Sequence, residues 1–218
     1  MSCYGLPICH CLIFLILLFL QQLLDANMNK SEIIERLLAG NSNFVNNKLS
    51  SEKSDSERRK VLVSGQDPFA IVLSCADSRI VPELVFDTGL GELFVVRVAG
   101  NVANTSSIAS IEYAVSHLGT SVLMVLGHQS CGAVTAAVEG GDNGHNINHL
   151  LDHISPAIHG TSKGATVDEV TKKNAMLTAE ELINRSSIIA EAVEQDKLRI
   201  VTAYYHLDSG KVEFLAKD

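Results

Sequence analysis

Short apolar runs recur along the chain and alternate with stretches whose apolar residues are spaced three or four apart. Five of these runs predict strands, at 69–73, 93–98, 122–127, 198–205 and 211–215. The first three are apolar almost without interruption, which is typical of strands buried on both faces of a parallel sheet. Asp208, Ser209 and Gly210 separate the last two runs and predict a hairpin turn there.

Helices are predicted between and before these strands, at 31–45, 56–64, 105–117, 131–139, 146–158 and 167–196, the last with a break near 184–186. Ser31 is the expected N-cap of the first helix, in which Ile34, Leu37 and Leu38 form an apolar stripe. Strands alternating with helices predict an α/β fold. We expect a mainly parallel central sheet of four parallel strands plus a C-terminal antiparallel edge strand, flanked by helices.

Composition narrows the class of protein. The chain has 218 residues, of which 46% are hydrophobic and 19% charged, so residues 28–218 fit a single domain with a sizeable core. Its net charge of −8 gives no basic surface for nucleic acid. Three of the five cysteines lie in the first dozen residues, and only Cys75 and Cys131 remain, which predicts a reducing, cytoplasmic location.

Residues 1–27 form a separate apolar segment. Residues 12–20 are continuously apolar, but this run is too short for a membrane span. A secretory signal would have such a core, yet no Lys or Arg precedes Lys30. The segment is therefore a start codon assigned too early, with Met28 as the natural start, or a signal or anchor, or a structured extension. Membrane contact, and a periplasmic or exported location, are expected only if it is a genuine signal or anchor.

Metal-binding residue types follow two of the predicted strands. Cys75, Asp77 and Arg79 come after the first strand, and His128 and Cys131 come after the third. Two thiolates and an imidazole suit Zn²⁺, and a carboxylate or a water can complete a tetrahedron. Because sites in open parallel sheets form at the carboxyl ends of the strands, we expect one zinc centre there.

These two segments, CADSR and HQSCG, resemble the Cys-x-Asp-x-Arg and His-x-x-Cys-Gly motifs of the β-class carbonic anhydrases. The resemblance continues through GQDPFAIVLSCADSR, GELFVVRVAGN, SIEYAVSHLG and YYHLDSGKVEFL, and covers residues 29 to 215. It implies one Zn²⁺ per subunit and reversible hydration of carbon dioxide to bicarbonate and a proton by zinc-bound hydroxide. It further implies that Asp77 is a zinc ligand in a closed state, and that in the open state Asp77 and Arg79 form a catalytic dyad.

The resemblance also assigns a substrate pocket. It implies that Gln66 donates a hydrogen bond to bound bicarbonate and that Phe94, Ala99 and Tyr113 form the wall of the substrate-binding pocket. Gly132 follows the Cys131 ligand at a helix start, where its backbone N–H can face an anionic product. In the family, part of this wall comes from a partner subunit, so a homodimer or homotetramer is expected, with the N-terminal helices packing on the partner. Two alternatives stay open: hydrolysis of a CO₂ analogue such as carbonyl sulfide or carbon disulfide, and a non-catalytic module in which Asp77 permanently closes the zinc site.

Three histidines, His145, His149 and His153, are spaced four residues apart. On one continuous helix they would lie opposite the apolar side chains of the same segment, Ile147, Leu151, Ile154 and Ile158. This arrangement favours a solvated helix face over a second metal site, although one histidine could relay protons if the helix borders the pocket.

Overall fold

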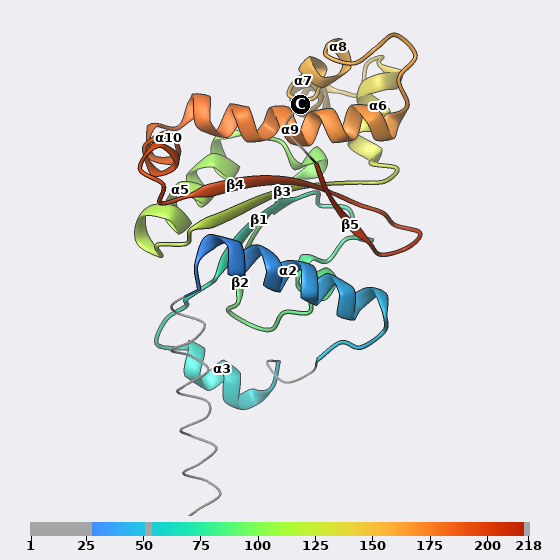
Figure 1. The fold of residues 1–218 in the computed structure, drawn as a ribbon. Helices are drawn as coiled ribbons and strands as arrows, with labels where there is room; N and C mark the ends of the chain where they lie inside the picture. The colour runs from blue at the N-terminus through green and yellow to red at the C-terminus, as the bar shows by residue number, and fades with distance from the viewer. Residues whose placement is uncertain (1–27, 51–53, 216–218) are drawn as a thin grey trace, which may run out of the picture.

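A computed structural model of the chain describes residues 28–50 and 54–215. The expectations for residues 1–27 therefore lie outside the described residues. The described chain contains a five-stranded sheet in the order β2-β1-β3-β4-β5 (Figure 1). The strands are β1 (Ala70–Ser74), β2 (Leu93–Arg97), β3 (Val122–His128), β4 (Arg199–Tyr205) and β5 (Val212–Leu215).

The sheet has the predicted directions. The pairs β1–β2, β1–β3 and β3–β4 are parallel, and only β5 pairs antiparallel, with β4. Every residue of β1 and β3 is buried, as their uninterrupted apolar runs predict, whereas β2 is a half-buried edge. All five strands begin and end within one residue of their predicted bounds.

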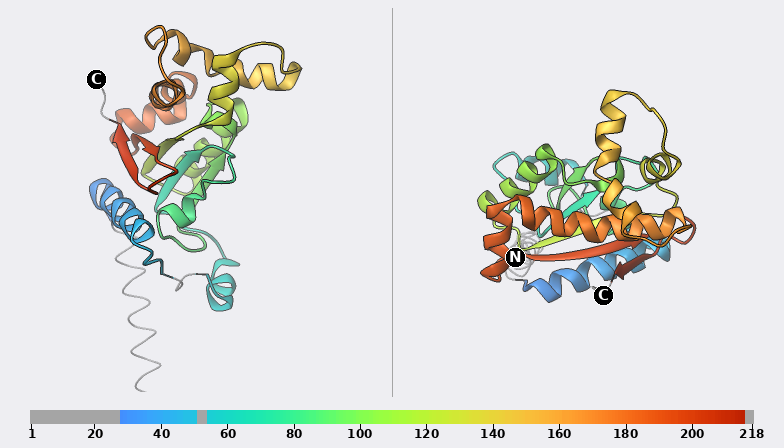
Figure 2. Two further views of the ribbon diagram at one scale, coloured as in Figure 1. Left: turned by 90° about the vertical axis from the view of Figure 1, so that its right-hand side faces the viewer. Right: turned by 90° about the horizontal axis from the view of Figure 1, so that it is seen from above.

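Helices cover both faces of the sheet. They are α2 (Lys30–Val45), α3 (Ser56–Leu62), α4 (Pro82–Val85), α5 (Thr105–His117), α6 (Gly132–Glu139), α7 (His145–Asp152), α8 (Ser155–His159), α9 (Val167–Arg185) and α10 (Ser187–Glu194), with a 3₁₀ turn, η1 (Ala99–Asn101). Figures 1 and 2 show α9 along one side of the sheet and α2 along the other. Alternate strand residues pack toward α5, α9 and α10 on one face, among them Ile71, Leu73, Leu123 and Val125.

The N-terminal helix packs on its own chain. Leu37 is fully buried in the same cluster as Val72 and Met124. Asn41 is buried as well, and its amide donates to the carbonyls of Val85 and Gly210. Leu38, in the same apolar stripe, remains 42% exposed. Packing of this helix on a partner subunit therefore stays a prediction, and it concerns the side of the helix that carries Leu38.

Three helix boundaries differ from prediction. Asn29, not Ser31, caps α2, because its side chain accepts from the backbone N–H groups of Ser31 and Glu32, while the Glu32 carboxylate accepts from the Asn29 N–H. The single helix expected at 146–158 is two, α7 and α8, because Pro156 lacks a backbone N–H and its ring would clash with the preceding turn. The helix predicted at 56–64 ends at Leu62, and the short α4 and η1 were not predicted.

No helix within residues 28–50 and 54–215 is both long and apolar enough to cross a membrane.

Candidate metal centre

The ends of two neighbouring strands bring the predicted ligands together. Cys75 directly follows β1, and His128 is the last residue of β3, which is the parallel neighbour of β1. A tight turn through Gln129 and Ser130 then leads to Cys131, the N-cap residue of α6. Because parallel strands end at the same edge of a sheet, residues far apart in the chain meet there.

The three side chains form one buried cluster. The Sγ atoms of Cys75 and Cys131 are 4.0 Å apart, and these sulfurs lie with a ring nitrogen of His128 within 4.8 Å of one another. Nδ1 of His128 lies 2.9 Å from the carbonyl of Gln129, so it carries the proton and donates. Nε2 is then left with a lone pair, is buried, and has no hydrogen-bond partner among the described residues. This donor set, with its unpartnered nitrogen, fits Zn²⁺.

The two thiols influence each other's ionisation. Cys131, followed by His128 and the backbone N–H of Gly100, lowers the pKa of the Cys75 thiol despite the opposing effect of burial. The pKa of Cys131 is raised, first by Cys75 and then by burial. A cation between them would reverse that repulsion and bring both thiols to the thiolate form.

Asp77 stands beside this cluster, held by Arg79. Nε and Nη2 of Arg79 donate to Oδ1 and Oδ2 of Asp77 at 2.9 and 2.7 Å, and the Arg79 backbone N–H donates to Oδ1 at 3.0 Å. These bonds from Arg79 are the main reason that the pKa of Asp77 lies well below its ordinary value. Oδ2 of Asp77 is 3.9 Å from Nε2 of His128. The carboxylate therefore lies next to the ligand atoms while Arg79 engages both its oxygens.

Two further groups, which the sequence reasoning did not single out, support the ligand loop. The guanidinium of Arg97, at the end of β2, donates to the backbone carbonyls of Cys75 and Asp77 at 3.0 and 2.7 Å. The N–H of Gly100 donates to Sγ of Cys75, and its carbonyl accepts from the buried Asn174 of α9. Gly100 has a φ of +71°, and a Cβ there would come within 2.8 Å of Ile154, so glycine is required. In the sequence, Arg97 and Gly100 could have been noticed only because they lie in GELFVVRVAGN, one of the segments that carry the family resemblance.

The residues predicted to line the substrate pocket are only partly near the cluster. Gly132 begins α6 next to Cys131 and opens on free space, and Ala99 lies in η1 beside Gly100. Gln66 is exposed in the loop after α3. Phe94 and Tyr113 contact each other, with ring centroids 6.4 Å apart, on the α5 side of the edge strand β2. Within one chain, these three side chains are not gathered around the cysteines.

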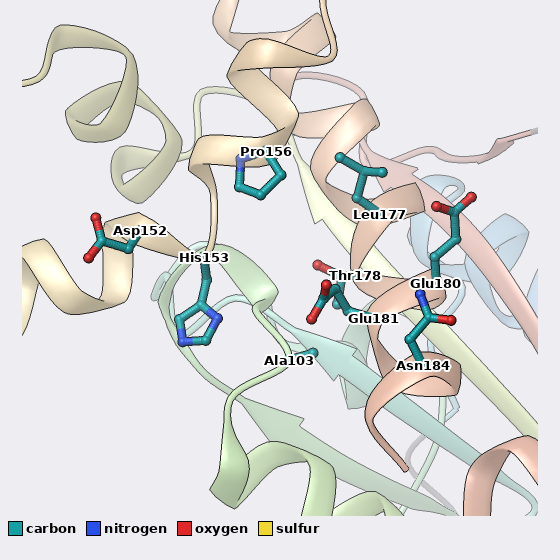
Figure 3. A pocket seen from close by; sticks show the side chains of 9 residues that line it. All are labelled: Ala103, Asp152, His153, Pro156, Leu177, Thr178, Glu180, Glu181 and Asn184. Carbon is teal, nitrogen blue, oxygen red and sulfur yellow. The ribbon is translucent and has the colours of Figure 1, made fainter. Parts of the chain in front are cut away.

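The three histidines do not lie along one helix. His145 and His149 are on α7 and exposed, whereas His153 is half-buried in the break before α8. His153 lines a pocket of about 210 Å³ between this break and α9, together with Thr178 and Glu181 of α9, and Figure 3 shows these side chains. Burial, then Arg185, lowers the pKa of His153. The predicted solvated face was therefore wrong for His153, and the predicted apolar face was wrong for Ile147, which is 52% exposed.

This arrangement supports metal-assisted chemistry on a small substrate. Two thiolates and one imidazole leave the fourth position of a tetrahedral zinc to a water or a carboxylate. The Asp77 carboxylate lies beside the cluster, and Arg79 holds it through a bidentate pair.

Comparison with known proteins agrees with this chemistry. A family model described as carbonic anhydrase matches residues 70–212. Carbonic anhydrase 2 of Mycobacterium tuberculosis is 37% identical over 191 residues, covering 85% of this chain and 92% of that protein. A carbonic anhydrase of Mycolicibacterium smegmatis is 37% identical over 193 residues, covering 86% and 94%. Among solved structures, a Coccomyxa β-carbonic anhydrase in complex with acetazolamide has a TM-score of 0.65 at 26% identity, covering 75% of this chain and 78% of that one. The matches span most of the chain in sequence and in fold, and the chain belongs to the β-class carbonic anhydrase family.

Proposed function

We propose that this carbonic anhydrase catalyses the reversible hydration of carbon dioxide to bicarbonate and a proton, using one zinc ion per subunit held by Cys75, His128 and Cys131. The observation that carries the proposal is the buried Cys–His–Cys cluster beside a carboxylate that is held by an arginine. A purely structural zinc site has no use for that arginine, since a fourth protein ligand would close it permanently.

Each residue then has a defined task. Zinc, when bound, lowers the pKa of a water to about 7 and so supplies a nucleophile at neutral pH. Asp77 would accept a hydrogen bond from the attacking water and orient it, because its carboxylate is kept charged and beside the cluster. Arg79 keeps Asp77 in that role through its planar fork, which matches both carboxylate oxygens.

The N-terminus of α6 offers a place for the bicarbonate product next to the cluster. Gly132 lies at the start of α6, where backbone N–H groups point outward and favour an anion such as bicarbonate. The open space at its Cα leaves room for a small molecule, and Ala99 lines the same region from η1.

The remaining pocket residues support an oligomer. Gln66, Phe94 and Tyr113 lie on the β2 side of the chain, away from its own cysteines, and Tyr113 is 46% exposed. We propose that they complete the site of a partner subunit in a homodimer or a homotetramer, with the half-buried edge strand β2 close to the interface. A fully active monomer in sedimentation experiments would contradict this part of the proposal.

The decisive experiment is stopped-flow CO₂ hydration with zinc-loaded protein beginning at Met28, compared with the same protein after zinc removal and with Cys131→Ala. We expect rapid hydration only in the zinc-loaded wild type. Stoichiometric zinc without hydration would reject the proposal and favour the closed module. The same preparation is assayed with carbonyl sulfide and carbon disulfide. Hydrolysis of either compound without CO₂ hydration would show that the substrate is a CO₂ analogue.

A further inference from the structure

The turn between β3 and α6 is held from outside the metal cluster. Its central residue, Ser130, has a φ of +52°, the left-handed conformation that non-glycine residues adopt at a cost. The Ser130 N–H donates to Oδ1 of Asp168 at 3.0 Å. On the other side of the residue, the Ser130 carbonyl accepts from Nη2 of Arg79 at 3.1 Å. One short peptide segment therefore connects Asp168 with the arginine that holds Asp77.

Asp168 is fixed to a rigid part of the fold. It lies in the first turn of α9, whose start is closed by a capping box between Thr166 and Glu169. The helix then packs along β3 and β4, where Thr171 and Asn174 are buried. Because its helix cannot move independently of the sheet, Asp168 can set the position of the exposed turn that it contacts.

The Asp168 carboxylate also influences a buried tyrosine. Tyr204 of β4 is 1% exposed, and its hydroxyl has no hydrogen-bond partner among the described residues. The pKa of Tyr204 is raised first by burial and next by Asp168. The well-formed bond of Asp168 is the one to the Ser130 N–H.

The contact to Arg79 matters because of the nitrogen that makes it. Nη2 donates one proton to the Ser130 carbonyl and another to Oδ2 of Asp77, at 2.7 Å. The carbonyl therefore fixes in space the same nitrogen that holds the outer oxygen of the carboxylate. If the backbone dihedral angles of Ser130 changed, its carbonyl would leave Nη2, and the half-exposed Arg79 side chain would lose its only described anchor outside Asp77.

We infer that Asp168 is a positioning residue for the metal centre: by holding the left-handed turn at Ser130, it keeps Arg79 in place and thereby keeps Asp77 away from the metal. The inference rests on the proposed function, since it assigns Asp168 a part in keeping that site open. It acts through the Ser130 peptide and Arg79, and contacts neither the metal ligands nor the substrate.

A purely structural role for Asp168 predicts something different. An acidic residue in the first turn stabilises any helix through the helix dipole. Glu169, the next residue, has the same charge in the same turn and closes the capping box, but among the described residues its carboxylate bonds only to Thr166. Glu169→Gln is therefore the matched control: it removes one charge from the first turn of α9, keeps an oxygen that can accept in the capping box, and does not touch Ser130.

The experiment compares Asp168→Ala, Asp168→Asn, Glu169→Gln and Tyr204→Phe, each zinc-loaded and full length. In Asp168→Ala we expect zinc content to stay at the wild-type level while kcat/KM for CO₂ hydration falls about 10- to 100-fold, the range for losing a charge-assisted hydrogen bond. Asp168→Asn keeps an uncharged acceptor oxygen and should lose about three- to tenfold. Glu169→Gln and Tyr204→Phe should retain wild-type hydration, even where they lower the unfolding midpoint.

A readout independent of activity comes from anion binding. The cobalt-substituted proteins are titrated with azide and followed by their visible spectra. Asp77 in the fourth position excludes azide, so Asp168→Ala should bind azide about 10- to 100-fold more weakly than wild type, as Arg79→Ala should. The two controls should bind it with wild-type affinity.

The inference is overturned if Asp168→Ala retains wild-type hydration and azide affinity, or if Glu169→Gln loses as much of both. If Asp168→Ala does not fold, Asp168→Asn decides, and unchanged azide affinity in that variant overturns the inference. Absence of hydration in the wild-type protein would instead reject the proposed function, and the azide series would still test whether Asp168 controls access to the metal.

Discussion

Replacing Arg79 with alanine tests the dyad most directly. Three hydrogen bonds from Arg79 hold the Asp77 carboxylate, two from the guanidinium and one from the backbone N–H. Arg79→Ala removes the two side-chain bonds and keeps the backbone bond to Oδ1. It also removes the link to the Ser130 carbonyl, whereas Cys75, His128 and Cys131 keep their positions. Asp77 is then free to turn toward the metal.

The size of the effect follows from these contacts. Both lost bonds join charged groups, but the Arg79 side chain is 52% exposed, so water replaces part of what is lost. We therefore assign each bond a factor of about three to ten in the balance between the open and closed states, and about 10- to 100-fold for the pair. Arg79→Lys should recover little, because an ammonium group supplies a point charge and not a planar fork.

The assay measures zinc content and CO₂ hydration on the same samples at alkaline pH. We expect Arg79→Ala to retain full zinc, because Asp77 becomes a fourth ligand, and to lose hydration by the factor given above. Arg199→Ala is the matched control, since it removes the same charge from an exposed residue at the start of β4, the end of that strand far from His128. A zinc-replete Arg79→Ala protein with wild-type hydration would reduce the Asp77–Arg79 pair to an ordinary surface ion pair and refute the reasoning.

Other expectations are simpler to test. Cys131→Ala should lose zinc and hydration together, and metal analysis showing stoichiometric zinc in an active variant would reject the ligand assignment. The CO₂ hydration rate should rise from about pH 6.5 to about pH 9. Because the pKa of Asp77 is lowered, its carboxylate stays charged over this range, and the rise therefore reports ionisation of the water activated by zinc. A flat pH profile would contradict this. Because the pKa of Asp77 is lower in the folded protein than in the unfolded chain, the Asp77–Arg79 pair stabilises the fold fully above the unfolded-state pKa of about 4. This stabilisation is lost as the pH falls through the folded-state pKa, and acid unfolding of Asp77→Asn beside wild type would reveal the loss. Protein begun at Met28 should be folded, zinc-loaded and active, and an insoluble or metal-free product would show that the first 27 residues are needed.

The apolar pattern alone was enough to predict the sheet. Uninterrupted apolar runs such as 122–127 are typical of strands buried on both faces of a parallel sheet, and the structure places β3 there. Helix boundaries were predicted less well, because they depend on single polar contacts. Asn29 and Ser31 are both good N-caps by residue type, and the reciprocal bond with Glu32 decides in favour of Asn29.

The Cys75–His128–Cys131 cluster was also predictable, because the topology of the sheet brings these residues together. Its three residues lie at the ends of β1 and β3, and an alternating strand–helix pattern already implies that such ends meet at one edge. The position of the pocket residues was not predictable in the same way. Phe94 and Tyr113 lie on the α5 side of an edge strand, so what they face depends on how subunits assemble.

The sequence by itself determined the strands, the ligand types and the pairing of Asp77 with Arg79, since each depends on residues that are neighbours in the chain or on a simple repeat. Only the tertiary structure decided what holds that pair in place. Asp168 reaches Ser130 across the fold, and Arg97 reaches the carbonyls of Cys75 and Asp77 from another strand. Hydrogen bonds between distant segments depend on exact distance and direction, which local residue preferences do not encode, and they become defined only when the packed sheet and helices fix where each donor points.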